Sequence, residues 1–386
     1  MKILVIASAV DLKHKLGCTP AWWQLLKALR EIGNDVIVIP YLGKAIESLW
    51  WRTYENPCCS ESLLYNRYLE MKQNRGISPS KKGIMEPVSA RLISSYIRPR
   101  WEKYLKQVLR EEKDVDLVLF LNMPLNHLGD IPLKIKSEFN VPVAYYDGDM
   151  PTILPKYSVD RGFKFDYYKG ADLSYYDAFF TNSKGVIRDL EAMGARNVRP
   201  LYYAADPEIF WPVDLRQDND VFFYGHGNEF REEWMTKMIA IPSTRMRSSK
   251  FLLAGKGFTI DLGNASVIRD VPVSTLATYV CRSKVSLNIT RWSHTSIYGS
   301  STSRPFELAS YGACIVSQPY NGIEEWFKVG KEVIIVNSED EAIETYGSLL
   351  SNDEERARIG ERARERLLRE HTYKHRASTL VGSVQG

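Results

Sequence analysis

The chain has 386 residues, of which 44% are hydrophobic and 25% are charged, and its formal net charge is +4. This length predicts two domains that each bury a core, and the composition is typical of a globular protein. The small net charge and the lack of a long lysine or arginine run exclude nucleic acid as the expected partner. Five scattered cysteines without metal-ligand spacing favour a reducing compartment, so we expect a cytoplasmic protein.

The first part of the chain predicts a βαβ unit. Residues 3–7 form a continuous apolar run, which is typical of a parallel strand buried on both faces. Residues 20–32 carry apolar side chains at helical spacing, and Gly33 ends this helix. Strands are expected next at 35–39, 115–121, 141–146 and 178–181. Between the second and third strands, residues 43–113 form an irregular, mostly helical and aromatic-rich insertion.

A second alternation of strands and helices follows residues 203–212, which contain two prolines and no hydrophobic period. We expect strands at 220–224, 251–254, 266–268, 285–289, 315–317 and 333–336, and helices that include 273–281 and 322–327. This order predicts an α/β protein with three parts: an N-terminal Rossmann-like domain (1–205), a C-terminal Rossmann-like domain (206–370) and a terminal helix (371–386).

The most informative segment runs from Ser303 to Ala313, between two expected strands. A small polar loop, 299–303, leads into a short helix that contains Pro305 and ends at Gly312. The N-terminus of such a helix favours anions, and Arg304 adds a cation suited to phosphate. Glu307, one turn later, is an acceptor for paired hydroxyls such as those of a ribose. Ser301, Thr302 and Ser303 complete the predicted site for a nucleotide diphosphate that carries a sugar.

The motif formed by Arg304, Phe306, Glu307 and Gly312 resembles the donor-binding segment of GT-B glycosyltransferases, especially the group 1 or family 4-like enzymes and their spore-maturation-protein-like relatives. The similarity continues through 322–327, 332–336 and 370–376. It implies the GT-B fold, two Rossmann-like domains with a cleft between them, and a last helix that returns to the first domain. Many family 4 enzymes have a second glutamate eight positions before the first, where this chain has Gly299.

The same resemblance extends the predicted substrate site to other positions. Gly225 and Arg231 lie in the first loop of the donor domain, and Lys256 follows the next strand. Asn288 precedes the donor loop, and Gly17 lies between the first strand and helix. Each of these residues also has an ordinary structural explanation. The glycines could simply form turns, the arginine and lysine could be solvent-exposed, and the asparagine could hydrogen-bond a buried backbone group.

Two residues that follow strands of the first domain are candidate general bases, Asp149 and His127. Asp149 belongs to the sequence Asp147-Gly148-Asp149, and an Asp-x-Asp pair is also the metal-nucleotide signature of the other large glycosyltransferase fold, GT-A. Because the C-terminal half resembles GT-B and supplies its own cation for phosphate, we predict no metal and no cofactor.

We therefore predict a metal-independent glycosyltransferase of the hexosyltransferase type, with a UDP- or GDP-linked sugar as donor, as in polysaccharide biosynthesis. The expected acceptor is a glycan or lipid-linked glycan held by the 43–113 insertion, with peripheral contact at the inner face of the membrane. Aromatic and basic side chains of that insertion suggest an exposed groove: Trp50, Trp51, Tyr54, Trp101, Arg52, Lys72, Arg75, Lys81 and Lys82. The alternatives are a nucleotide-sugar epimerase and a catalytically silent nucleotide- or glycan-binding protein of the same fold.

Overall fold

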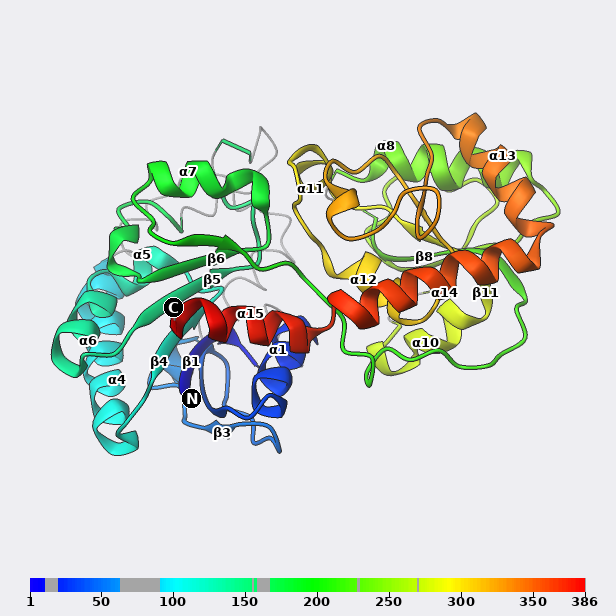
Figure 1. The fold of residues 1–386 in the computed structure, drawn as a ribbon. Coiled ribbons are helices and arrows are strands. Elements are labelled where there is room, and N and C mark those ends of the chain that lie inside the picture. Colours follow the sequence, from blue (N-terminus) through cyan, green and yellow to red (C-terminus); the bar gives the residue numbers. More distant parts are fainter. Residues whose placement is uncertain are drawn as a thin grey trace. The chain divides into compact units, whose positions relative to one another are not determined.

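The computed structural model describes residues 1–10, 20–62, 91–154, 156–157, 167–227, 230–268 and 271–385. The chain divides into two compact units, and each has its own parallel sheet (Figure 1). The first unit comprises Met1–Tyr202 and Arg376–Gly386, and the second comprises Tyr203–His375.

The sheet of the first unit has seven parallel strands in the order β3-β2-β1-β4-β5-β6-β7. These strands are β1 (Lys2–Ala9), β2 (Asp35–Leu42), β3 (Arg52–Thr53), β4 (Leu117–Leu121), β5 (Val143–Asp147), β6 (Ala178–Thr181) and β7 (Val198–Pro200). The helices are α1 (Pro20–Glu31), η1 (Ile93–Ile97), α4 (Arg98–Glu112), α5 (Leu125–Leu128), α6 (Ile131–Phe139), η2 (Leu173–Tyr175), η3 (Lys184–Val186) and α7 (Ile187–Ala192). Every residue of β4 and β5 is buried, as expected for strands covered on both faces.

The sheet of the second unit has six parallel strands in the order β10-β9-β8-β11-β12-β13. They are β8 (Asn219–His226), β9 (Phe251–Lys256), β10 (Ser266–Ile268), β11 (Ser283–Asn288), β12 (Ile315–Ser317) and β13 (Ile334–Ile335). The helical elements are α8 (Glu232–Met235), η4 (Thr236–Ala240), α9 (Ile241–Arg245), α10 (Val273–Cys281), α11 (Trp292–Ser296), α12 (Ser303–Ser310), η5 (Ile323–Glu325), α13 (Glu339–Leu350) and α14 (Asp353–Glu370). From its first strand, this order is 3-2-1-4-5-6, the doubly wound Rossmann order.

Alternate side chains of the second sheet pack against helices on its two faces. Phe223 points to the core shared with η4 and α13, where Met238 and Tyr346 are fully buried. The neighbouring Phe222 points the other way and stacks on Tyr279 of α10, with 6.1 Å between ring centroids. Figure 1 shows α8 and α13 on one face and α10, α12 and α14 on the other. This double cover leaves the strand ends as the exposed polar edges of the sheet.

The chain's last helix, α15 (Tyr373–Gln385), begins in the second unit and continues in the first. At its start, the backbone N–H of Thr372 donates to Nδ1 of His375 over 3.2 Å. Further along, Nε of Arg376 donates to the carbonyl oxygen of Tyr202 over 2.9 Å, and Arg199 contacts Ser383. These bonds attach the helix to the first unit.

Several predicted elements differ from the structure. The expected helix at 322–327 is only the short 3-10 turn η5, because Gly322 adopts a φ of 87° and directs the chain away from regular helix. Two short strands, β3 and β7, were not predicted. Much of the 43–113 insertion lies outside the described residues, including all of 63–90.

Close contact between α12 and α14 depends on a glycine, which gives a stability prediction. A Cβ added to Gly360 would lie 2.0 Å from the carbonyl oxygen of Gly312. We therefore expect Gly360→Ala to lower the free energy of unfolding by about 1–3 kcal/mol, because overpacked backbone must move apart.

Gly347 of α13 is the matched control, because it is exposed and a Cβ there meets nothing within 4 Å. Gly347→Ala should stabilise the protein by about 0.5–1 kcal/mol through helix propensity. Thermal melts of both variants check the pair. Equal melting temperatures would show that the close contact at Gly360 does not constrain the fold.

Candidate active site

The candidate donor site lies where three strands of the second sheet end. The carboxyl ends of β8, β9 and β11 carry Gly225, Lys256 and Asn288, and the segments after β11 form α11 and α12. Open parallel sheets bind their ligands at this edge. The sequence motif that begins at Ser303 therefore lies at the edge where the fold predicts a ligand.

One glycine at this edge makes room for the guanidinium group of Arg304, and a second lets the ends of β8 and β9 approach each other closely. Gly225 and Gly255 are paired across β8 and β9, and both have a φ of +139°. A Cβ on Gly225 would lie 2.3 Å from Nη2 of Arg304, and one on Gly255 would lie 1.9 Å from the oxygen of Gly225. Both glycines are thus required by close approach as well as by backbone conformation.

Arg304 is held beneath the edge rather than extended into solvent. Its guanidinium carbon lies 5.0 Å from the ring centroid of Phe223 and 5.2 Å from that of Tyr224. Nη1 donates to the carbonyl oxygen of Ile289, while Nε is buried without a hydrogen-bond partner among the described residues. Burial lowers the pKa of Arg304. A group of this kind is rigid and retains hydrogen-bonding capacity, which suits it to an anion.

Glu307 lies one turn further along α12 and is buried, whereas Arg304 is half-buried. The hydroxyl of Tyr224 donates to its Oε2 over 2.5 Å. Burial raises the pKa of Glu307, while hydrogen bonds from Tyr224 and Ser303 and the charge of Arg304 lower it. The carboxyl group is thus fixed by a neighbour on β8, with capacity for a further donor at its other oxygen.

A cluster of basic side chains surrounds the start of α12. The charges of Arg291 and Arg231 lower the pKa of His294, after burial itself, and Arg291 also lowers the pKa of Arg304. Arg231 and His294 are 7% and 5% exposed. The lowered pKa keeps His294 neutral, so the positive charge comes from the arginines, and a bound anion would balance it in this poorly hydrated region.

The remaining predicted donor residues have different environments. Ser301 is fully buried, and its Oγ accepts the N–H of Tyr203 over 2.9 Å. Asn288 is also fully buried and donates from Nδ2 to Oγ of Ser317 over 2.9 Å, so it joins β11 to β12. Thr302 precedes α12 without making a capping side-chain bond, and Ser303 begins the helix. Lys256 is exposed at the end of β9.

In the first unit, Asp149 also lies at the carboxyl edge of its sheet, just after β5. It is half-buried, and its Oδ2 accepts Nδ2 of Asn122 over 2.8 Å. Asp147, the last residue of β5, is fully buried, and burial raises its pKa to about 7. The two carboxyl groups of the Asp-x-Asp sequence therefore occupy different environments.

His127, the second candidate base, lies on the short helix α5. Its Nδ1 is 2.7 Å from the hydroxyl of Tyr41. Burial, together with the charge of Arg98, lowers the pKa of His127 to about 4. A neutral imidazole with so low a pKa is a poor proton acceptor at neutral pH, so the environment favours Asp149 for this role.

The prediction that the insertion forms an exposed aromatic groove is wrong for two of its four aromatic residues. Trp51 and Trp101 are 4% and 2% exposed, so neither offers a free ring face. Trp51 packs edge-on against Trp23, with centroids 5.0 Å apart, and Trp101 packs against Tyr41 at 5.3 Å. Arg52 is held by Glu112 and Asp35, both at 2.8 Å. Trp50 and Tyr54 are half-buried. Gly17, Lys72, Arg75, Lys81 and Lys82 lie outside the described residues.

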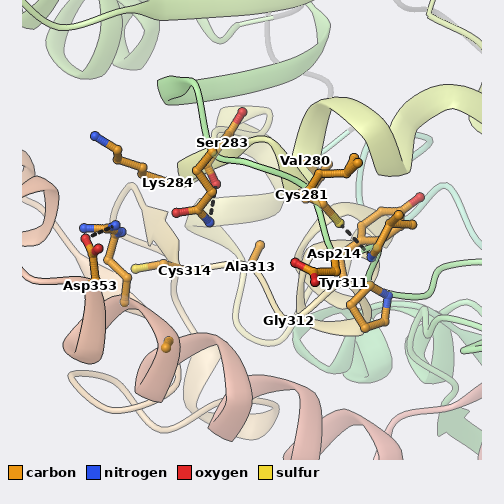
Figure 2. A pocket seen from close by; sticks show the side chains of 16 residues that line it. Asp214, Val280, Cys281, Ser283, Lys284, Tyr311, Gly312, Ala313, Cys314 and Asp353 are labelled. Carbon is orange, nitrogen blue, oxygen red and sulfur yellow. Dashed lines mark hydrogen bonds and ion pairs between the residues drawn. The ribbon is translucent and has the colours of Figure 1, made fainter.

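A cavity of about 350 Å³ in the second unit lies at the other edge of the sheet, among the amino ends of β11 and β12. Figure 2 shows Cys281, Ser283, Lys284 and Cys314 around it. None of the candidate donor residues lines this cavity. This cavity is therefore separate from the candidate donor site.

Among the described residues, no three His, Cys, Asp or Glu side chains are grouped in a way that could hold a metal ion. Within the same residues, no helix has the length and apolar character needed to cross a bilayer.

Comparisons with known proteins agree with this architecture. Residues 231–382 match the family model described as glycosyl transferase-like. No curated protein matches the sequence. The fold is shared with sucrose-phosphate synthase from Thermosynechococcus elongatus, at a TM-score of 0.68 and 14% identity over 99% of this chain and 97% of that one.

Two other solved structures are similar across the whole chain. HepE of Anabaena in complex with UDP-glucose has a TM-score of 0.62 and 12% identity, over 100% of this chain and 99% of that one. The trehalose-6-phosphate synthase OtsA has a TM-score of 0.61 and 12% identity, over 100% and 98%. The chain has the GT-B fold. The predicted fold class is thereby confirmed, with two Rossmann-like units built on parallel sheets.

Tyr224 and Tyr168 are site residues that the sequence did not single out. Each donates its hydroxyl to a buried carboxylate, Tyr224 to Glu307 and Tyr168 to Asp147. The sequence could have indicated Tyr224, because it directly precedes Gly225, a predicted site residue. The second pair is 21 positions apart, and only the fold brings it together.

Removing the hydroxyl of Tyr224 should destabilise the protein in a pH-dependent manner. Tyr224→Phe removes one of the two side-chain donors to the buried carboxylate of Glu307 and leaves Ser303, and the lost bond costs about 1–3 kcal/mol. That bond lowers the pKa of Glu307, so its loss raises the folded-state pKa further above the unfolded value. A group whose pKa rises on folding in this way loses stability as the pH rises, because the native state must release a proton that it holds tightly.

The melting temperature of Tyr224→Phe should therefore fall further below wild type at pH 8 than at pH 5. Glu307→Gln in the same background supplies a neutral side chain and should reduce the difference between the two pH values. A deficit that is constant across pH would mean that the tyrosine stabilises the fold only by packing.

Proposed function

We propose that this protein is a glycosyltransferase that moves a sugar from a nucleotide-sugar to a glycan or lipid-linked glycan. The observation that carries this proposal is the basic cluster at the carboxyl edge of the second sheet, beside the buried Glu307. Arg231, Arg291 and Arg304 lie where parallel α/β sheets bind ligands, with the neutral His294 beside them, and the combined positive charge of the three arginines favours a multiply charged anion. A nucleoside diphosphate has this charge, and Glu307 can accept from a ribose hydroxyl.

The reaction is substitution at the anomeric carbon. As the acceptor hydroxyl attacks, its proton passes to Asp149, and its oxygen forms a bond to the anomeric carbon. The bond from that carbon to the diphosphate oxygen breaks, and the nucleoside diphosphate leaves with the electron pair. The positive groups of the cluster stabilise the charge that develops on the leaving diphosphate. In this proposal Asp149 is the general base of the first unit and His127 is its rival.

The donor is proposed to be UDP- or GDP-linked. HepE was solved with UDP-glucose, and the family model over 231–382 is glycosyl transferase-like, which supports a nucleotide-sugar here. Closeness to the spore-maturation-protein-like enzymes remains a prediction from the motif. A silent binding protein is the second candidate, because Gly299 replaces one glutamate of the family 4 pattern.

For the acceptor, the described part of the insertion offers a smaller surface than expected. Leu49 is 94% exposed beside Trp50, and Nζ of Lys27 lies 5.9 Å from the Trp50 ring centroid. Lys27 is itself 5% exposed and pairs with Glu31 over 2.9 Å, so the surface consists of the exposed leucine and the half-buried indole, which suit a sugar ring or the apolar part of a lipid. We propose that this part of the first unit contacts the acceptor and the inner face of the membrane.

The donor assignment predicts that Glu307→Ala weakens nucleotide binding without unfolding the second unit. Hydrogen bonds to a charged acceptor contribute about 1.5–3 kcal/mol each, so affinity for UDP or GDP should fall by roughly ten-fold or more. Titration calorimetry measures this loss. Glu344→Ala, at an exposed position of α13, is the control and should bind as wild type does. Unchanged affinity in Glu307→Ala would remove Glu307 from the site.

The basic cluster also predicts activity that does not require a divalent cation, because arginine side chains already supply the positive charge for the leaving diphosphate. Turnover measured in excess EDTA should equal turnover in added magnesium or manganese. If EDTA abolishes turnover and manganese restores it, the GT-A type of metal role for Asp147 and Asp149 replaces the one proposed here.

A further inference from the structure

The carboxyl end of β5 holds a buried carboxyl group to which the mechanism above gives no role. Asp147 has no exposed surface. The hydroxyl of Tyr168 donates to its Oδ2 over 2.6 Å, and the backbone N–H of Asp149 donates to its Oδ1 over 2.9 Å. Asp147 therefore contacts the neighbouring carboxylate residue through the main chain and is itself fixed by a tyrosine.

Asn122 holds the same turn from the other side. This residue follows β4 with a φ of +54°, a conformation that asparagine tolerates better than most residues. Its Oδ1 accepts the N–H of Gly148 over 3.1 Å, and its Nδ2 donates to Oδ2 of Asp149 over 2.8 Å. The backbone and the carboxylate of Asp149 are thus fixed by two strands of the sheet.

We propose that Asp147 is the positioning residue for Asp149, and that together with Tyr168 it fixes the Gly148–Asp149 turn so that the Asp149 carboxylate is presented to the acceptor hydroxyl. This inference rests on the proposed function, in which Asp149 is the general base. Asp147 touches no substrate in this arrangement and acts only through Asp149. A buried carboxyl group needs hydrogen-bond donors. Here Tyr168 holds the Asp147 side chain, and the Asp147 side chain in turn holds the backbone N–H of Asp149.

The same geometry makes the positioning depend on pH. The titratable groups that act on Asp147 or feel its charge are Asp149 on its turn, Tyr168, and Tyr145 and Tyr146 on β5. No cation of the described residues is among the causes of its shift, so burial and the charge of Asp149 raise its pKa to about 7. Ionisation of Asp147 near neutral pH then places a second negative charge in the turn that carries the base.

The first test compares Asp147→Ala with Asp147→Asn. The asparagine side chain can still accept the N–H of Asp149, whereas alanine cannot. The transfer rate kcat should fall at least about ten-fold in Asp147→Ala and less in Asp147→Asn, with the donor KM unchanged in both. The limb of the kcat profile near pH 7 should disappear in Asp147→Asn and move to higher pH in Tyr168→Phe, which loses a bond that lowers the Asp147 pKa.

Equal kcat values in the alanine and asparagine variants, or a limb near pH 7 that persists in Asp147→Asn, would overturn the positioning role. If Asp147→Ala fails to fold, the pH profiles of Asp147→Asn and Tyr168→Phe decide the question. If wild-type protein transfers no sugar, the proposed function fails and the positioning role fails with it.

The second test measures the ionisation of Asp147 through protein stability and does not depend on enzymatic activity. Its folded pKa lies above its ordinary value, so the native state loses stability as the pH rises from about 4 towards 7. Relative to Asp147→Asn, wild-type protein should therefore lose at least about 3 °C of melting temperature between pH 5 and pH 8. Asp114→Asn, at an exposed carboxylate of the same unit, should follow wild type. Parallel curves for wild type and Asp147→Asn would show that Asp147 is already ionised at pH 5, which would overturn the pH dependence.

Discussion

The candidate site depends on a half-buried arginine and a buried glutamate one turn apart at the start of α12. Arg304 has aromatic rings beside it and a single backbone carbonyl as acceptor, and Glu307 has Tyr224 as its donor. Buried charges of this kind cost free energy unless their hydrogen bonds are completed. Nε of Arg304 has no partner among the described residues, so in the proposed function a ligand would supply the missing bond. In the proposed function, a bound diphosphate would complete the hydrogen bonds of Arg304, and the ribose attached to it would complete those of Glu307.

The glycines of β8 and β9 follow from the same constraint. Arg304 can lie here only if Gly225 carries no Cβ, and Gly255 is required in turn because a Cβ there would meet the oxygen of Gly225. The close approach of α14 to the end of α12 at Gly360 then fixes the helix from its other side. Local sequence, packing and charge thus all act on α12, which explains why an eight-residue helix can hold a half-buried arginine and a buried glutamate in register.

Much of the fold could be predicted from periodicity. The strands Ala178–Thr181 and Ser266–Ile268 have the predicted bounds, because each is a short run between turn signals. The strand β3 was not predicted, because a strand of two residues is too short to show an alternation of apolar and polar side chains. The placement of Arg304 and Glu307 on a helix after a polar loop was also predictable. The depth of Arg304 was not, because it depends on rings from β8, about 80 positions earlier in the chain. The burial of Trp51 and Trp101 was not predictable either, because it depends on contacts with Trp23 and Tyr41, which are distant in the sequence.

The most direct measurement is the release of nucleoside diphosphate from UDP- and GDP-linked sugars by purified protein, with Arg304→Gln as the comparison. The account predicts that at least one donor is cleaved, slowly by water and faster with acceptor glycan. It also predicts that Arg304→Gln reduces the rate by about ten-fold or more, since a charge-assisted contact to phosphate is lost. If wild-type protein neither cleaves nor binds any of these donors, or if Arg304→Gln cleaves them at the wild-type rate, the central claim is contradicted.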